Sequence, residues 1–569
     1  MGILTSCRAS LTCLVAALAL ASCGNDEPPK PGAPSGGGTP TAPVPPGALE
    51  IVFTYGSEKE DWIKEVTETF NKDAAKSVLK GKRLHITAIP MGSGECIDEL
   101  VEGTRKAHLT SPASVAFIKL GNARWRAKTG KDLVDSTENL VLSPVVIAMW
   151  KPMAEALGVG SKPVGWAELL ALARSDKGWS AYEKPQWGRF KFGHTHPQFS
   201  NSGLISLFAE VYAAAGKTTG LQLADLEKPE IARYVGDIEK SVVHYGSSTG
   251  FFGKKMFANG PGYLSAAVLY ENMIIEANSG KYPLQFPLVA VYPKEGTFWS
   301  DHPAGVVERE WVTPEHREAA KVYLQFLQQR PQQERALFYG FRPANPEIAL
   351  AEPIDAAHGV NPKEPQTTLE VPSADVIEGI VQLWQRNKKH ADVALVIDVS
   401  GSMRDEQKMQ YAREGAKQFI AMMKDEDTIS LLAFNNQCTW AQQNVLLKTG
   451  RAKVVEQIDS LLADGGTALY DAVDLAYQYV STRTSPDRIS AVVVLTDGQD
   501  TDSKVKLNEL LQKIQLDSEK RPIRVFTIGY GSGAVKSVLQ SIADTTQARF
   551  FSGTQKNIET VFKDISTFF

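Results

Sequence analysis

Five oxygen-bearing side chains in the last third of the chain have the types and spacing of a site for a hard cation. Asp398, Ser400 and Ser402 lie in the run ALVIDVSGSM, Thr467 follows a glycine pair in GGTALYDA, and Asp497 ends the run VVVLTD. Hydroxyl and carboxylate oxygens suit Mg²⁺, Ca²⁺ or Mn²⁺, whereas softer ions prefer thiolate or imidazole. Because Mg²⁺ prefers an octahedral set of oxygens, these side chains leave a position for a carboxylate from another molecule.

The segments around these residues predict strands that alternate with helices. Continuous apolar runs such as DVALVID, TISLLAF and ISAVVVLTD are typical of parallel strands that are covered on both faces. IRVFTIGYG and ARFFSG predict further strands, and apolar residues recur at helical spacing between the runs. This alternation predicts a doubly wound α/β sheet, in which ligands bind at the carboxyl ends of the strands. The oxygen-bearing residues lie at those ends.

Residues 389–569 resemble the von Willebrand factor A domain, with its Rossmann-like fold and metal-ion-dependent adhesion site. The resemblance implies that Ser400, Ser402 and Thr467 are direct hydroxyl ligands, and that Asp398 and Asp497 act directly or through water. It implies Mg²⁺ as the cofactor, with Mn²⁺ and Ca²⁺ as alternatives, and a protein partner held through the metal. Taken singly, Thr467 and the aspartates could instead cap helices. Their joint order and spacing favour the metal.

The front of the chain has the layout of a secretory signal. Residues 1–22 carry one charge, Arg8, followed by LTCLVAALALAS, which is too short to span a membrane. The sequence LASC at residues 20–23 resembles the lipobox of bacterial lipoproteins. The resemblance implies cleavage before Cys23 and lipidation of that cysteine. It thus implies a lipid-anchored protein of the cell envelope that faces the periplasm or the exterior. The alternative is a secreted protein with an accidental cysteine.

Residues 23–48 are rich in proline and glycine, so we expect a tether rather than a folded segment. The formal net charge of the whole chain is -4, and the loss of Arg8 with the signal makes it -5. No basic patch indicates a nucleic-acid partner. Cys96 and Cys438 remain in different predicted domains, and we expect two unpaired thiols.

Residues 49–350 form a second predicted domain. EIVFTYGS, KRLHITAIP and SVAFIKLG predict strands, and DWIKEVTETFN and CIDELVEGT predict helices. The succession resembles two-lobed extracellular solute-binding proteins, with crossing segments near SPVVIAMWKP and PLVAVYPKEGTFW. The resemblance implies a periplasmic-binding-protein-like fold in which lobe one comprises residues 50–142 and 292–346. A small-molecule ligand would bind in the cleft between the lobes.

Small polar residues at the expected starts of helices are candidates to line that cleft. They are Ser57, Ser93, Gly94, Asn201 and Ser202. Helix N-termini with hydroxyls beside them suit a small oxyanion or an anionic metabolite. Aromatic faces could instead stack a sugar; the candidates are Tyr55, Tyr263 and Tyr270. The simplest alternative is that the serines and the asparagine only cap helices.

Two further segments have less specific interpretations. His194 and His196 in GHTHPQ could hold a transition metal, but no other ligand clusters near them in the sequence, so we expect two solvated histidines. Residues 351–388 join the two domains and contain ADVIEGIVQLWQRNKK, an amphipathic helix that we expect to pack on one of them.

The sequence contains no G-x-x-x-x-G-K-[ST], G-x-S-x-G or H-E-x-x-H motif, so we predict a binding protein and not an enzyme. Two alternatives remain beside a binding protein with a protein partner. One is the substrate receptor of a transport system, with the A domain as a docking module. The other is a chelatase-like assembly factor, against which the lipobox argues because such factors are cytoplasmic.

Overall fold

The computed structural model describes residues 44–73, 76–485, 487–515, 523–531, 533–555 and 557–569. The predicted signal, Cys23 and nearly all of the tether lie outside these residues. No helix in the described part of the chain is both long and apolar enough to cross a membrane. Of the two cysteines described, Cys96 is buried, Cys438 is half-buried, and both are free, as predicted.

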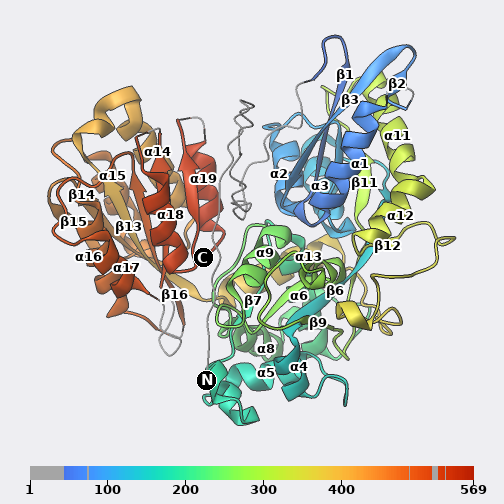
Figure 1. Ribbon diagram of the computed structural model, residues 1–569, viewed down its shortest axis with the longest axis horizontal. Helices are drawn as coiled ribbons and strands as arrows, with labels where there is room; N and C mark the ends of the chain where they lie inside the picture. The colour runs from blue at the N-terminus through green and yellow to red at the C-terminus, as the bar shows by residue number, and fades with distance from the viewer. Residues whose placement is uncertain (1–43, 74–75, 486, 516–522, 532, 556) are drawn as a thin grey trace, which may run out of the picture. The chain divides into compact units, whose positions relative to one another are not determined.

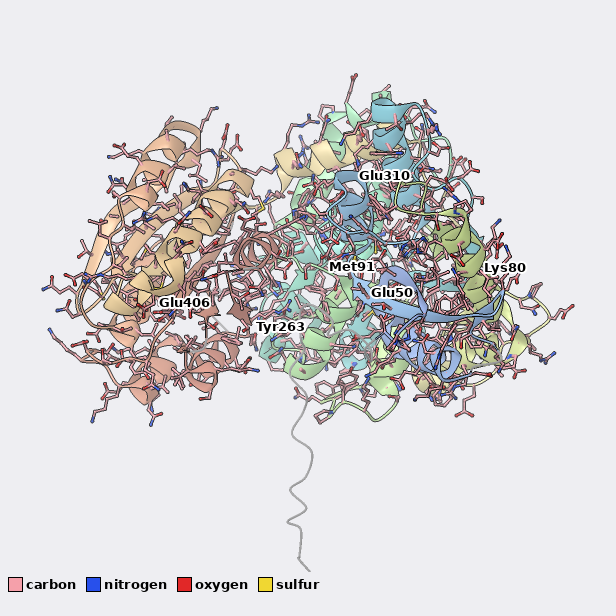
Figure 2. The ribbon with its side chains drawn as sticks, turned by 90° about the horizontal axis from the view of Figure 1, so that it is seen from above. Glu50, Lys80, Met91, Tyr263, Glu310 and Glu406 are labelled. Atoms are coloured by element: carbon pink, nitrogen blue, oxygen red, sulfur yellow. The ribbon has the colours of Figure 1, made fainter. Side chains whose placement is uncertain are left out.

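Lobe one is built on a sheet in the order β2-β3-β1-β4-β11-β5. Figure 1 labels β1, β2, β3 and β11 of this sheet. Its strands are β1 (Leu49–Gly56), β2 (Val78–Leu79), β3 (Lys82–Met91), β4 (Leu109–Ser111), β5 (Glu138–Asn139) and β11 (Pro303–Val306). β1 is parallel to β3 and β4, so the carboxyl ends of these three strands lie together. Its helices are α1 (Glu60–Lys72), α2 (Ser93–Glu102), α3 (Val115–Thr129), α11 (Pro314–Gln328) and α12 (Arg330–Phe338). Met91, which ends β3, is labelled in Figure 2.

The prediction of a strand at SVAFIKLG is wrong, because this segment begins α3. Ser114 caps the helix: its side chain accepts a hydrogen bond from the amide of Ala116 at 3.2 Å. Short apolar runs do not distinguish a strand from a buried helix by periodicity alone. The strand in this region is β4, which is only three residues long.

Lobe two has a sheet in the order β10-β6-β8-β7, with β9 and β12 also paired to β6. Its strands are β6 (Val141–Trp150), β7 (Phe192–Gly193), β8 (Ala266–Tyr270), β9 (Leu288–Val291), β10 (Trp299–Ser300) and β12 (Arg342–Pro343). Its helices are α4 (Lys151–Leu157), α5 (Trp166–Arg174), α6 (Asn201–Ala215), α7 (Leu223–Leu226), α8 (Pro229–Glu239), α9 (Thr249–Asn259) and α10 (Glu271–Asn278). α6 is buried at every position from 201 to 212, so it is the central helix of this lobe.

The amphipathic helix of the connector, α13 (Ala374–Asn387), packs on α6 and α8 of lobe two. Val376, Ile377 and Ile380 are buried, and Trp384 contacts the rings of His196 and Tyr245. The connector helix therefore packs on the solute-binding-like domain, as the apolar stripe predicts, and it contacts α3 of lobe one as well as lobe two. Short 3₁₀ turns complete the two domains; they are η1 (Ser57–Lys59), η2 (Gly178–Tyr182), η3 (Pro185–Trp187), η4 (Ala356–His358) and η5 (Gly401–Gln407).

The C-terminal domain contains a sheet in the order β15-β14-β13-β16-β17-β18. Its strands are β13 (His390–Asp398), β14 (Thr428–Phe434), β15 (Cys438–Leu446), β16 (Arg488–Thr496), β17 (Arg524–Tyr530) and β18 (Phe550–Gly553). Every pairing is parallel except that of β14 with β15. Its helices are α14 (Lys408–Met422), α15 (Leu447–Asp459), α16 (Leu469–Ser481), α17 (Leu507–Ile514), α18 (Lys536–Thr545) and α19 (Ile558–Ser566).

Side chains of β13 alternate between two cores, which shows that helices cover both faces of this sheet. Val393 and Leu395 pack with residues of α14, α15 and α19. Ala394 and Val396 pack with residues of α16, α17 and α18. The arrangement confirms the predicted α/β class, a two-lobed domain followed by a doubly wound one.

The antiparallel edge strand β15 was not predicted. Its residues, CTWAQQNVL, are half-buried or exposed along its whole length, so it lacks the apolar run that marks the central strands.

Candidate functional site

The predicted metal ligands lie at the carboxyl edge of the C-terminal sheet. Asp398 is the last residue of β13, and Asp497 directly follows β16. β13 and β16 are parallel neighbours, with Ile397 opposite Leu495, so the two carboxylates leave the sheet side by side. Ser400 and Ser402 follow in the turn into η5, to which Glu406, labelled in Figure 2, also belongs.

Hydrogen bonds connect four of the five residues in one network. The amide of Ser400 donates to Asp398 Oδ1 at 2.8 Å, and the Ser400 and Ser402 hydroxyl oxygens are 3.1 Å apart. Ser402 Oγ donates to Asp497 Oδ1 at 2.7 Å. Residues 95 positions apart in sequence therefore share one small cluster of oxygens.

Thr467 reaches the same cluster from the loop before α16. A Cβ placed on Gly498 would lie 3.6 Å from Thr467 Oγ1 and 3.8 Å from Ser402 Oγ, so the two hydroxyls flank this glycine. The amide of Thr467 donates to Thr501 Oγ1 and to Asp502 Oδ2, both at 3.0 Å. Thr501, which the sequence did not single out, and Asp502 thus position the threonine.

The site places two carboxylates in a buried setting. Asp398 and Asp497 are 0% and 1% exposed. Burial raises the pKa of Asp398, the nearby charge of Asp497 raises it further, and hydrogen bonds from Ser400 and Thr496 act in the opposite direction. Lys408 Nζ lies 2.6 Å from Asp497 Oδ2 and partly balances the charge. The sequence analysis missed Lys408, although its place at the start of α14, just after the two serines, could have indicated it.

The donor set fits a hard divalent cation. It comprises hydroxyl oxygens and carboxylate oxygens, with no thiolate or imidazole. Both the chemistry of these oxygens and their positions support the fit. Two strand ends position the carboxylates, and two loops position the hydroxyls.

A cavity of about 660 Å³ lies between the two lobes of the N-terminal domain. Lobe one contributes η1, α1 and the end of α12, and lobe two contributes α9 and α10. The lining residues are Ser57, Glu58, Glu60, Asp61, Trp62, Gly250, Lys254, Asn272, Ile275, Glu276, Ser279, Lys281, Phe338, Tyr339, Phe341, Glu352, Pro353 and His358. Of the five candidate cleft residues, only Ser57 is among them.

The other four candidates are buried, and their polar groups bond within the protein, apart from Asn201 Oδ1, which has no hydrogen-bond partner among the described residues. Ser93 Oγ accepts from the amide of Ala113 at 2.9 Å, and the amide of Gly94 donates to Phe199 O at 2.9 Å. Asn201 donates to Tyr270 Oη and Ser300 Oγ, and Ser202 Oγ lies 2.8 Å from Thr195 Oγ1. The role of these residues in ligand binding stays a prediction. The aromatic candidates Tyr55, Tyr263 and Tyr270 are buried and do not line the cavity.

Ion pairs across the cavity connect the lobes. Lys254 Nζ lies 3.1 Å from Glu60, and Lys281 Nζ lies 2.7 Å from Asp61. Burial by itself raises the pKa of Glu58, but the charge of Lys59 and the hydrogen bond to His302 outweigh it and lower the pKa to about 2. The lining carries five carboxylates against the ammonium groups of two lysines, so its surplus charge is negative.

The two histidines of GHTHPQ are not solvated, so this expectation is wrong. His194 is 0% exposed and His196 is 6% exposed. His194 Nε2 lies 2.9 Å from Glu239 Oε1, and Glu210 is also close. The fold brings in acidic partners that are 16 and 45 residues away in sequence, which inspection of the local sequence did not reveal.

Comparisons with known proteins agree with this division of the chain. Residues 392–565 match the family model of the von Willebrand factor type A domain, and residues 137–362 match that of a bacterial extracellular solute-binding protein. An uncharacterized protein of Synechocystis is 30% identical over 160 residues, which cover 27% of this chain and 36% of that protein. An uncharacterized protein of Mycobacterium tuberculosis is 19% identical over 542 residues, 88% of this chain and 73% of its own length.

Among solved structures, a periplasmic thiamin binding protein is similar with a TM-score of 0.43 and 16% identity, covering 60% of this chain and 96% of its own. The chain thus joins a domain like those of bacterial extracellular solute-binding proteins to a C-terminal von Willebrand factor type A domain.

Proposed function

We propose that this chain is a lipid-anchored binding protein of the bacterial cell envelope with two separate sites. Its solute-binding-like domain captures a small ligand in the cavity between its lobes. Its A domain binds a protein partner through a divalent cation that bridges to a carboxylate of that partner. The observation that carries the proposal is the convergence of Asp398, Ser400, Ser402, Thr467 and Asp497 on one sheet edge.

Each residue of the A-domain site has a role in this proposal. Ser400, Ser402 and Thr467 offer hydroxyl oxygens to the cation, and the two aspartates supply negative charge directly or through water. The cation, Mg²⁺ first with Mn²⁺ and Ca²⁺ as alternatives, supplies a positively charged position for an incoming carboxylate. Asp502 and Thr501 hold the loop that presents Thr467.

The cavity supports a ligand with a cationic group more than it supports an oxyanion. Its surplus carboxylates favour positive charge, and Phe338, Tyr339 and Phe341 offer aromatic surface to an organic cation. An anionic ligand was the first expectation, on the basis of helix N-termini. The amide of Gly94, which such an anion would need, already donates to Phe199.

The envelope location rests on the family match and on the predicted lipobox. The solute-binding family that residues 137–362 match is bacterial and extracellular. Lipidation at Cys23 would anchor the chain firmly, since each buried CH₂ contributes about 0.8 kcal/mol. The proline- and glycine-rich segment would then hold the folded domains away from the bilayer.

The same family match also favours a second candidate function, the substrate receptor of a transport system with the A domain as its docking module. Both functions use the same two sites, but they differ in the partner. Cross-linking in intact cells decides between them: recovery of a permease subunit favours the receptor.

The metal site is tested by thermal unfolding of the full chain with Mg²⁺ or with EDTA. An ion whose free concentration is about a hundred times its dissociation constant stabilises the native state by about 2.7 kcal/mol. For a domain of this size we expect the midpoint of the A-domain transition to rise by roughly 5–10 °C. Asp398→Ala should abolish the rise.

The matched control is Asp405→Ala. Asp405 is exposed on η5, three residues beyond Ser402, and its carboxylate does not belong to the oxygen cluster. This variant should keep the full metal-dependent rise. An equal rise in the Asp398 variant, or no rise in the parent at millimolar Mg²⁺ and Mn²⁺, would refute the metal site.

A further inference from the structure

Lobe two contains a fully buried cluster of ionisable groups, remote in sequence from the A-domain site. His194 follows β7, Glu210 lies in α6, and Glu239 ends α8. All three side chains are 0% exposed. One ligand atom from each lies within 4.8 Å of the other two. Groups that carry charge are rarely buried unless they are paired or bind a metal, so the cluster needs an explanation.

The hydrogen bonds of His194 determine which ring nitrogen can bind a cation. Nδ1 lies 2.8 Å from the carbonyl oxygen of Thr195, which only accepts, so Nδ1 carries a hydrogen. In the neutral imidazole, Nε2 is then an acceptor with a free lone pair. That lone pair faces Glu239 Oε1 at 2.9 Å, which in the carboxylate form is also an acceptor. Two acceptors at this distance require a proton or a cation between them.

The two glutamates leave further acceptor capacity directed at the same place. Tyr245 Oη donates to Glu239 Oε2 at 2.5 Å, and Ser206 Oγ donates to Glu210 Oε1 at 2.9 Å. Glu210 Oε2 is buried and has no hydrogen-bond partner in the described part of the chain. A buried carboxylate oxygen that has lost its water and gained no partner destabilises the native state, so something in the native protein should satisfy it.

The charges of the cluster are not balanced by an ion pair with lysine or arginine. Lys388 is buried above the ring of Tyr245, with Nζ 5.9 Å from the ring centre, and makes no ion pair with either glutamate among the described residues. A divalent cation would neutralise both carboxylates while leaving the imidazole neutral. Burial and the charge of Glu239 raise the pKa of Glu210, so protonation of this glutamate is the competing way to balance the charge.

We propose that His194, Glu210 and Glu239 form a second metal site, which binds one divalent transition-metal ion of the Zn²⁺ class. The imidazole distinguishes it from the A-domain site, whose donors are all oxygen, because imidazole and carboxylate together suit Zn²⁺ and its neighbours. The bond from Nδ1 to a backbone carbonyl is the partner that metal-bound histidines usually have. Tyr245 would orient Glu239 through its hydrogen bond, and a water would complete the coordination.

The geometry needs only a small adjustment. Ligands about 2.1 Å from a tetrahedral ion lie about 3.4 Å apart. His194 Nε2 and Glu239 Oε1, now 2.9 Å apart, would move slightly further apart. The ligand oxygen of Glu210, which lies within 4.8 Å of the other two ligand atoms, would move closer to them. Because the ligands come from α6, α8 and the segment directly after β7, the ion would link the central helix of lobe two to its neighbours. Its role is structural, since no described ligand atom is exposed.

The test uses the full chain with Asp398→Ala, so that the A-domain site does not contribute metal. The protein is unfolded in denaturant with a chelator and refolded with Zn²⁺ or Co²⁺, because the buried site fills as the chain folds. We expect one zinc per chain by mass spectrometry after gel filtration. We also expect visible absorption from the Co²⁺ form and a higher unfolding midpoint than after refolding with EDTA. Glu210→Gln should lower the bound zinc at least tenfold and abolish that difference.

His316→Ala in the same background is the control. His316 stacks on His108 with ring centres 4.1 Å apart, a pair at the surface of lobe one where zinc could bind adventitiously. This variant should keep the zinc, and loss of the zinc would overturn the assignment to lobe two.

The competing protonated pair makes the opposite prediction for Glu210→Gln, because an amide replaces a carboxylic acid of the same shape. A chain that refolds without stoichiometric metal, together with a Gln variant as stable as its parent, overturns the proposal. If the Gln variant does not fold, the Co²⁺ spectrum of the parent decides, and no visible absorption overturns the proposal.

Discussion

Lys408 shows how a single residue can set the strength of the A-domain site. Its ammonium group lies 2.6 Å from Asp497 Oδ2, and the side chain is 14% exposed. A buried carboxylate without a partner is costly, so Lys408 stabilises the metal-free site. The same positive charge repels an incoming cation. Lys408 should therefore weaken metal binding while it stabilises the domain without metal.

Lys408→Met separates these two effects. Without metal, we expect the free energy of unfolding of the A domain to fall by about 1–3 kcal/mol, since Asp497 Oδ2 loses its ion pair and only the bond from Ser402 to Oδ1 remains. With Mg²⁺, we expect the ion to replace the missing charge, so the stabilisation by metal exceeds that of the parent. Urea unfolding in EDTA and in Mg²⁺ measures both quantities.

Lys417→Met is the comparison for this prediction. Lys417 lies on the same helix and pairs with Asp459 at 2.8 Å, but Lys417 is only half-buried and Asp459 is exposed. Exposed pairs contribute about 0–1 kcal/mol, so this variant should change neither quantity much. A similar metal response in both variants would show that Lys408 does not compete with the ion.

Among the elements, the predictions from sequence were most accurate for strands that combine an apolar run with polar residues at the strand end. β13, β14 and β16 contain long apolar runs, so their existence and burial followed from local pattern, as did the oxygens at the ends of β13 and β16. α3 was mistaken for a strand because its first residues are apolar and β-branched or aromatic. β15 lacks an apolar run altogether.

The local sequence pattern did not reveal which elements contact one another. Glu210 and Glu239 reach His194 only because α6 and α8 pack beside β7, and the sequence spacing carries no sign of this. Thr501 and Asp502 likewise support Thr467 from a loop 34 and 35 residues away. Sequence pattern singled out the residues that we propose as metal ligands, but not the residues that hold them in place.

The close approach of α2 to the segment before α6 determines how tightly the lobes close. The amide of Gly94, in the first turn of α2, donates to Phe199 O at 2.9 Å. A Cβ on Gly94 would lie 2.1 Å from Gln198 O and 2.7 Å from Phe199 Cα, which are backbone atoms that cannot rotate away. Only glycine fits this contact between the lobes.

Gly94→Ala should therefore separate the lobes. We expect a larger radius of gyration by small-angle X-ray scattering and a loss of about 1–3 kcal/mol in stability of the N-terminal domain, the usual cost of overpacking. Gly262→Ala is the control, since nothing lies within 4 Å of a Cβ there. Equal scattering curves for the two variants would mean that the lobes close without this contact.

At the scale of the whole molecule, the two proposed sites differ in chemistry and lie in different domains. One is a cluster of hydroxyl and carboxylate oxygens at a sheet edge, and the other is a cavity with acidic and aromatic lining between two lobes. The chain between the domains includes α13, which packs on lobe two. Because α13 also contacts α3 of lobe one, a relative movement of the two lobes on ligand binding would act on α13 and, through it, on the start of β13.

This arrangement predicts separable sites with a measurable coupling. Asp398→Ala should abolish the Mg²⁺-dependent capture of envelope proteins and leave small-ligand binding unchanged. Ser57→Ala with Phe338→Ala should weaken the ligand and leave the capture unchanged, because both residues line the cavity. Calorimetric titration of organic cations, amino acids, sugars and oxyanions into the full chain identifies the ligand class. Coupling between sites is reciprocal, so a ligand that tightens the partner must itself bind more tightly when the partner is present. If the Asp398 variant kept its fold but lost both activities, the two sites would not be separate. A small and equal change in the affinities for ligand and partner, each measured with the other present, would show that α13 transmits the movement of the lobes.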